Sequence, residues 1–173
     1  MEINIRQENA GDQKEVYEIN RLAFGQDNEA NLVDLLRQSA AFVPALSLVA
    51  THSNKLVGHI LFSKIIIVDE RQNEFQSLAL APMAVRPDFQ KSGIGGQLIK
   101  KGLEVAKNLG FKSVIVLGHE HYYPKFGFEP AEKWNIKAPF EVPSSVFMAI
   151  ELVKDGLKNI SGKVVYPKAF ETV

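Results

Sequence analysis

The spacing of hydrophobic residues in the first half of the chain predicts a strand, two helices and a β-hairpin. Ile3 and Ile5 alternate with polar neighbours, which is typical of a half-buried strand. Apolar residues then recur at helical spacing before two longer apolar runs begin. The predicted elements are a strand at 3–5, helices at 16–23 and 28–38, and hairpin strands at 46–52 and 56–69 joined by the turn 53–55.

The second half continues the alternation of strands and helices. The run SVIVLG has the continuous apolar character of a strand that is buried on both faces. The predicted elements are strands at 75–85, 113–118, 127–131 and 145–153, a helix from Ile94 to Leu109 that ends at Gly110, and a short helix at 121–126. No repeat or linker interrupts the pattern, so we expect one mixed α/β (α+β) domain over residues 1–173.

Composition and charge narrow the class of partner. With 46% hydrophobic and 23% charged residues, the chain is typical of a globular protein. It has 20 Lys plus Arg and 20 Asp plus Glu, so its formal net charge is zero. Nucleic-acid-binding domains usually carry a basic excess. We therefore expect no nucleic-acid partner, while a small anionic ligand remains compatible with the charge.

The chain contains no cysteine, which excludes disulfides, thiolate metal sites and cysteine nucleophiles. Its first residues lack the apolar stretch of a signal peptide. The longest nearly apolar run, residues 40–50, is much shorter than the roughly 20 residues that a membrane helix needs. We expect a cytoplasmic protein with no membrane partner.

Residues 90–98, QKSGIGGQL, place glycines where a predicted strand gives way to a predicted helix. The first turn of a helix has unpaired backbone N–H groups and a partial positive charge. Glycine lets an anion approach this backbone closely because no Cβ intervenes. The stretch therefore suits a phosphate group, although an ordinary loop with a glycine cap would have the same composition.

The glycine spacing argues against the two commonest nucleotide loops. A dinucleotide fingerprint requires glycine at position 98, where the chain has Leu98. No P-loop sequence occurs anywhere in the chain. The sequence therefore lacks the main evidence that would indicate a nucleoside triphosphate or nicotinamide cofactor.

Two motifs in the correct order resemble those of the GNAT superfamily of N-acetyltransferases. The first is Gln90-x-x-Gly93-x-Gly95, which resembles the loop that binds the pyrophosphate of coenzyme A. The second is VLGHEHYYPKFGFEPA at 116–131, and the tail over 147–170 is similar to the YhbS-like branch of predicted acetyltransferases. The resemblance implies the GNAT fold, a mixed central sheet of about six to seven strands flanked by helices, with splayed strands that hold acetyl-CoA.

The resemblance also implies which residues bind the cofactor. Backbone groups of Met83, Ala84 and Val85 would hold the pantetheine arm and polarise the thioester carbonyl. Pro82 in this strand favours a bulge, with a strand end at Ala81 as the alternative. The pyrophosphate would lie on backbone N–H groups, with side-chain contacts from Gln90 and Lys91; the residues of this loop are Gln90, Lys91, Ser92, Gly93, Ile94, Gly95 and Gly96.

Tyr123 occupies the position at which the family carries its catalytic tyrosine, so it is the expected acid for the departing thiolate. A phenol with a pKa of about 10 stays protonated at neutral pH and can donate its proton. The alternative is that Tyr123 is a half-buried packing residue, as we expect for Tyr122.

The base is less well defined, because Ala79 stands where some family members carry glutamate and residues 77–85 contain no carboxylate. His119 is the first candidate base, since it follows the second strand that would line the cofactor. Glu120, His121 and the more distant His59 remain alternatives. A bound water or an already neutral amine would also serve.

The sequence therefore supports an acetyl-CoA-dependent N-acetyltransferase. It would transfer the acetyl group directly to a primary amine of a small molecule or peptide in a ternary complex, since no cysteine can form an acyl-enzyme. The alternative is a non-catalytic sensor that binds an acyl-CoA. We expect no metal, and the chain is compatible with a monomer or a homodimer.

Overall fold

A computed structural model describes residues 1–173, and the chain forms two compact units within it. Unit 1 consists of Met1–Ser63, Ala81–Val105 and Lys168–Val173, and unit 2 consists of Lys64–Leu80 and Ala106–Pro167. Two long strands, β3 (Lys55–Val68) and β4 (Glu74–Val85), contribute residues to both units. The single domain expected from the sequence stays a prediction.

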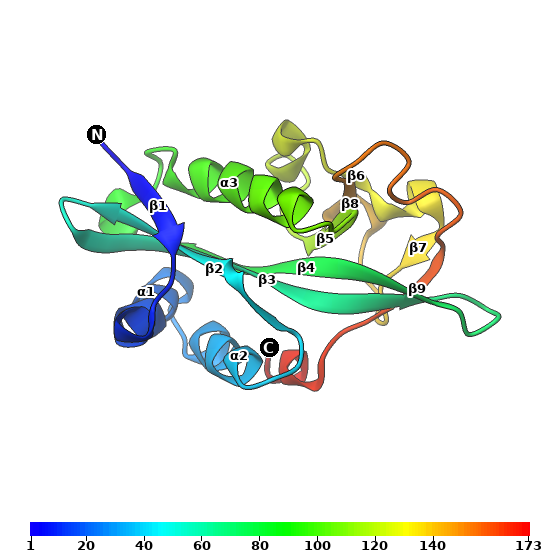
Figure 1. The fold of residues 1–173 in the computed structure, drawn as a ribbon, viewed down its shortest axis with the longest axis horizontal. Helices are drawn as coiled ribbons and strands as arrows, with labels where there is room; N and C mark the ends of the chain where they lie inside the picture. Colours follow the sequence, from blue (N-terminus) through cyan, green and yellow to red (C-terminus); the bar gives the residue numbers. More distant parts are fainter. The chain divides into compact units, whose positions relative to one another are not determined.

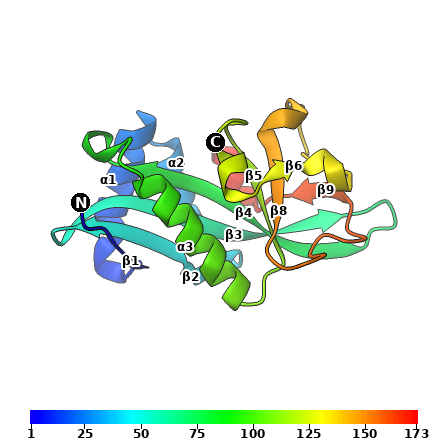
Figure 2. The same cartoon turned by 90° about the horizontal axis from the view of Figure 1, so that it is seen from above.

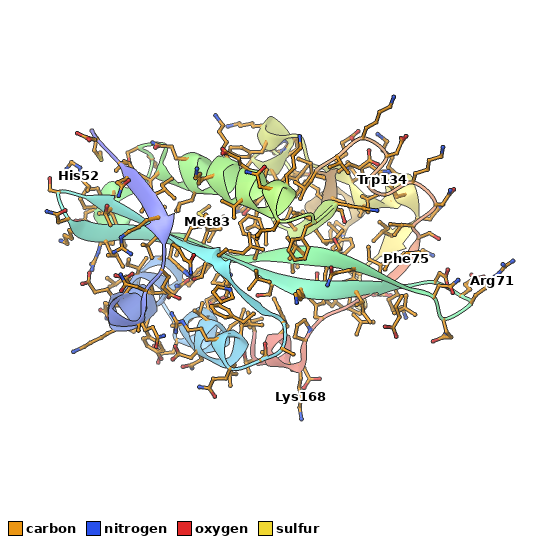
Figure 3. All side chains as sticks on the ribbon, viewed as in Figure 1. His52, Arg71, Phe75, Met83, Trp134 and Lys168 are labelled. Carbon is orange, nitrogen blue, oxygen red and sulfur yellow. The ribbon has the colours of Figure 1, made fainter.

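The strands of unit 1 form an antiparallel arrangement. Strand β1 (Asn4–Gln7) pairs with β2 (Phe42–His52), and β2 pairs with β3. Ser53 and Asn54 close the β2–β3 hairpin with φ angles of 50° and 63°, the left-handed conformations of a tight hairpin turn. Figure 3 labels His52 beside this turn. The predicted hairpin is confirmed, and β2 begins earlier than its apolar run.

Helices cover both faces of the unit 1 strands (Figures 1 and 2). Helices α1 (Gln13–Phe24) and α2 (Asn28–Arg37) lie on one face, and α3 (Ile94–Asn108) lies on the other. Gly25 ends α1 with φ 68°, a conformation that favours glycine. Buried apolar residues from α1 and α2 pack against β2, β3 and β4; they include Val16, Ile19, Leu32, Leu36, Val49, Leu61 and Ala84.

Unit 2 is built around a short buried strand, β5 (Ser113–Leu117). It pairs in parallel with β4 through one residue pair, Ala79 with Ile115, and antiparallel with β8 (Phe147–Glu151). Strand β8 also pairs with β6 (Glu129–Pro130). On the other side β3 pairs with β9 (Gly162–Val165), which pairs in parallel with β7 (Ile136–Lys137). Figure 3 labels Arg71 at the tip of the β3–β4 hairpin.

The structure confirms the long predicted elements and corrects the short ones. The helix expected at 121–126 is a 3-10 turn, Tyr123–Phe126, because Pro124 provides no backbone N–H for a longer ladder. Strands β7 and β9 were not predicted, since neither has enough residues to show an alternating pattern. The remaining 3-10 segments are Ala10–Asp12, Pro87–Phe89, Ala131–Trp134, Ser144–Val146 and Lys168–Thr172.

Strand β4 continues through Pro82 to Val85, so the alternative of a strand end at Ala81 is wrong. The peptide bond between Ala81 and Pro82 is cis. None of the helices is both long and apolar enough to cross a membrane.

Candidate active site

The loop after β4 is tied to the strand ends of unit 1. The backbone N–H of Arg86 donates to the carbonyl of Val57 at 2.8 Å, and Arg86 Nε donates to the carbonyl of Leu56 at 2.9 Å. Gln90 Nε2 donates to the carbonyl of Val85 at 3.1 Å. Gln90 therefore holds the loop against the end of β4, a role that its motif position alone did not reveal.

The backbone N–H groups from Lys91 to Gly96 donate to no acceptor in the structure. Lys91 and Gly93 have φ angles of 63° and 84°, and the first hydrogen bond of α3 runs from Gln97 N to Gly93 O at 3.1 Å. The hydroxyl of Ser92 donates to the carbonyl of Phe89 and fixes the turn before the helix. Successive free N–H groups at a helix start form a site for an anion.

Unit 1 brings together all the residues that the sequence predicted for cofactor binding. Met83, Ala84 and Val85 lie on β4, a few residues before the loop, with Ala84 and Val85 buried and Met83 half-buried. Figure 3 labels Met83 on this strand. The Lys91 side chain is exposed and forms no ion pair, so its charge remains available to a ligand.

Tyr123 lies in unit 2, with 8% of its surface exposed. Its ring makes edge contacts with the rings of Tyr122 and Phe128, at centroid distances of 5.2 and 5.6 Å. Burial raises the pKa of Tyr123 to about 12, and Tyr122 adds to the increase. The phenol is therefore protonated at neutral pH.

The hydroxyl of Tyr123 has no hydrogen-bond partner. The fully buried side-chain polar atoms without a partner are Asn20 Oδ1 and Ser63 Oγ. The Tyr123 hydroxyl is not among them, so it reaches solvent although its ring is buried. The ring is therefore held by its aromatic neighbours while the hydroxyl has no partner within the chain, and the role of proton donor stays a prediction.

His119 follows β5 and lines a pocket of about 700 Å³ in unit 2, together with Leu117, Gly118, Glu120, His121, Tyr122 and Val146. The side chain of His119 is exposed, and its backbone carbonyl accepts a hydrogen bond from Tyr123 N at 3.3 Å. His121 lies 3.6 Å from Glu120, and both are exposed. The structure thus brings the predicted acid and the predicted base into one unit.

His59 is fully buried and is excluded as a base. Its Nδ1 lies 3.3 Å from Asn20 Nδ2, and its Nε2 lies 3.1 Å from Ser47 Oγ. Burial lowers the pKa of His59 to about 3, and the charge of Arg37 lowers it further. Since both ring nitrogens are occupied within the core, His59 links α1 to β2 and β3 and does not reach a substrate.

The structure offers neither a carboxylate beside Ala79 nor a cluster of metal ligands. Ala79 is buried on β4, and the strand offers no carboxylate near it, as its sequence already indicated. No group of three or more His, Asp or Glu side chains is arranged to hold a metal ion.

A model of the acetyltransferase (GNAT) family matches residues 13–128. The chain belongs to the GNAT family. The chain is 41% identical to the uncharacterized N-acetyltransferase YjhQ of Escherichia coli (strain K12) over 76% of this chain and 73% of that protein. It is 32% identical to the uncharacterized N-acetyltransferase YhbS of the same strain over 87% of each.

Solved GNAT structures show the same fold. The YhbS structure from Escherichia coli in complex with CoA has a TM-score of 0.89 and 29% identity, covering 98% of this chain and 92% of that one. A GNAT acetyltransferase from Brucella melitensis in complex with acetyl-CoA has a TM-score of 0.79 and 30% identity, covering 98% of both chains. The expected GNAT fold and acetyltransferase class are therefore confirmed, and the ligands of these two proteins agree with the expected cofactor.

Proposed function

We propose that this GNAT protein transfers the acetyl group of acetyl-CoA directly to a primary amine of a small molecule or peptide. The observation that carries the proposal is the run of free backbone N–H groups from Lys91 to Gly96 at the start of α3. Such a run suits a pyrophosphate. The complexes of two similar GNAT proteins with CoA and acetyl-CoA support the choice of cofactor.

The cofactor would run from the loop along the end of β4. Its pyrophosphate would accept hydrogen bonds from the loop N–H groups, and the exposed Lys91 would add a positive charge. Backbone groups of Met83 to Val85 would bind the pantetheine arm and polarise the thioester carbonyl. The single residue pair between the parallel strands β4 and β5 supports this assignment, because backbone groups beyond it are left for another partner.

The transfer itself needs one attack and one protonation. The neutral amine nitrogen forms a bond to the thioester carbon, and the carbon–sulfur bond breaks as the tetrahedral intermediate collapses. Tyr123 donates its hydroxyl proton to the departing thiolate and recovers a proton from solvent. The amine gives its own proton to His119 or to water. His119 is suited to this step because it is exposed and lies in the same unit as Tyr123.

Acetyl-CoA turnover with a panel of amines tests the proposal. Tyr123→Phe should lower kcat by about 10²- to 10⁴-fold, the usual contribution of a general acid, and should leave CoA affinity unchanged. Tyr122→Phe is the matched control, since Tyr122 is the neighbouring half-buried phenol and should lose little activity. A turnover rate that Tyr123→Phe does not change would remove Tyr123 from the mechanism.

A sensor that binds acyl-CoA without transfer is the second candidate, favoured by Ala79 and the absence of a carboxylate from residues 77–85 of β4. Calorimetry separates the two functions. CoA binding together with no turnover across a broad amine panel would support the sensor.

A further inference from the structure

Gly118 lies directly against the ring of Tyr123. A Cβ atom at position 118 would be 2.3 Å from Tyr123 Cε2 and 2.8 Å from Cδ2, distances that real Cβ atoms essentially never show. The close approach therefore requires glycine, and any side chain at this position would displace the ring.

The ring has little freedom to yield. The backbone N–H of Gly118 donates to the carbonyl of Val146 at 2.9 Å, which anchors the glycine to the segment before β8. The backbone of Tyr123 is held by its bond to His119, and Tyr122 and Phe128 contact the ring edge-on. The position of the ring is thus set by contacts on several sides, while its hydroxyl remains without a partner.

We propose that Gly118 is a positioning residue for acetyl transfer: the missing side chain at position 118 determines where the hydroxyl of Tyr123 lies. The inference rests on the proposed role of Tyr123 as the proton donor. Gly118 also lines the pocket of His119, but the effect proposed for its missing side chain acts through the ring. A displacement of about 1 Å at a reacting group can lower a rate by about 10²-fold, so the effect on kcat should be large.

A double-mutant cycle of Gly118→Ala and Tyr123→Phe tests this dependence. Gly118→Ala should lower kcat by about tenfold or more, while the KM for acetyl-CoA changes by less than about twofold. In the Tyr123→Phe background the same change should have no further effect on kcat, because the hydroxyl is already gone. Additive losses of kcat, or a loss confined to KM, would overturn the proposal.

Gly102→Ala is the matched control. Its Cβ would lie 2.2 Å from Cε1 of the buried ring of Phe62, so the steric conflict is similar, but it occurs in unit 1. This variant should lose stability and keep the kcat of its folded fraction. If Gly118→Ala behaves in the same way, Gly118 is a packing residue only and the proposal is wrong.

A measurement without turnover separates this inference from the proposed function. The NMR signals of ¹³C-labelled tyrosine at neutral pH, with Tyr123→Phe to assign the signal, report the environment of the Tyr123 ring. The ring contacts Tyr122 and Phe128 edge-on, so Gly118→Ala should shift the Tyr123 signals as the ring is displaced from these neighbours. Unchanged Tyr123 signals contradict the positioning role even if no amine substrate is found.

The cycle remains informative if Gly118→Ala fails to fold. Tyr123→Ala removes the ring, so Gly118→Ala should fold again in that background if the conflict is with the ring. Failure of this double variant to fold, while Tyr123→Ala alone folds, would locate the conflict elsewhere and overturn the proposal.

Discussion

Gly93 has a left-handed backbone conformation, φ 84°, with no atom close to where a Cβ would lie. Packing therefore tolerates a larger residue at this position, while the backbone conformation does not. Lys91 shares the left-handed region, and together they turn the chain so that successive N–H groups of the loop remain free. At the residue scale, the proposed anion site depends on backbone dihedral angles more than on side chains.

Gly93→Ala should weaken CoA binding by about 10- to 100-fold, because loss of one hydrogen bond to a charged group is worth about 1.5–3 kcal/mol. The left-handed conformation should also destabilise the fold by about 1–2 kcal/mol. Calorimetry with CoA and thermal unfolding measure the two effects.

Gly25→Ala is the control for that prediction. Gly25 has φ 68° and equally open surroundings in the same unit, at the end of α1. It should show the same loss of stability with unchanged CoA affinity. Equal CoA affinity in both variants would show that the loop around Gly93 does not bind the cofactor.

His59 should make the stability of the protein depend on pH. Its folded pKa of about 3 lies below its ordinary value of 6.5, so the unfolded chain binds the proton more tightly. The contribution is fully present above pH 6.5 and is lost as pH falls towards 3. The free energy of unfolding should fall by up to about 1.4 kcal/mol per pH unit in this window.

Denaturant unfolding at several pH values measures this slope. His59→Leu should flatten it, although the variant starts from a lower stability because Asn20 and Ser47 lose a partner. His121→Gln, at an exposed histidine, should retain the slope. The same slope in His59→Leu would assign the acid sensitivity to other groups.

At the scale of elements, α3 and β3 meet closely because Gly102 faces the buried ring of Phe62. A glycine in the middle of a helix lowers helix propensity by about 1 kcal/mol relative to alanine. The close packing against Phe62 explains why glycine stands at position 102.

Gly102→Ala should therefore be destabilising, although alanine favours helices. Overpacking of a core costs about 1–3 kcal/mol, which equals or exceeds the gain in helix propensity. Thermal or denaturant unfolding checks the sign. Lys101→Ala, at the exposed neighbouring position, should change stability little, and increased stability in Gly102→Ala would contradict the packing argument.

At the scale of the whole molecule, β3 and β4 run through both compact units. A strand that is covalently continuous between two units is difficult to unfold in one of them alone. The sequence predicts a single domain, which would unfold as one unit.

Unfolding should therefore be one cooperative transition. Tryptophan fluorescence and far-UV circular dichroism should give coincident curves, because the single Trp134 reports on unit 2 and circular dichroism reports on both units. Two separated transitions would show that the units unfold independently.

Much of the fold and of the candidate site was predictable because the signals are local. The glycines within residues 90–96 favour a turn by their own backbone freedom. Tyr123 is identified by its position in the motif at 116–131. Strands β7 and β9 were not predictable, since they have too few residues for a periodic pattern and exist through pairing with distant partners. Gly118 was overlooked for a similar reason: only the packed ring of Tyr123 explains it.

The sequence by itself determined the family, the order of the main elements and the position of the glycine-rich loop that we propose as the cofactor site. These features depend on residues that are close together in the chain. Only the tertiary structure decided that His59 is a buried link, that the Tyr123 ring is held while its hydroxyl is free, and that Gly118 must lack a side chain. Burial and hydrogen-bond partners arise from residues brought together across the chain, and no local pattern specifies them.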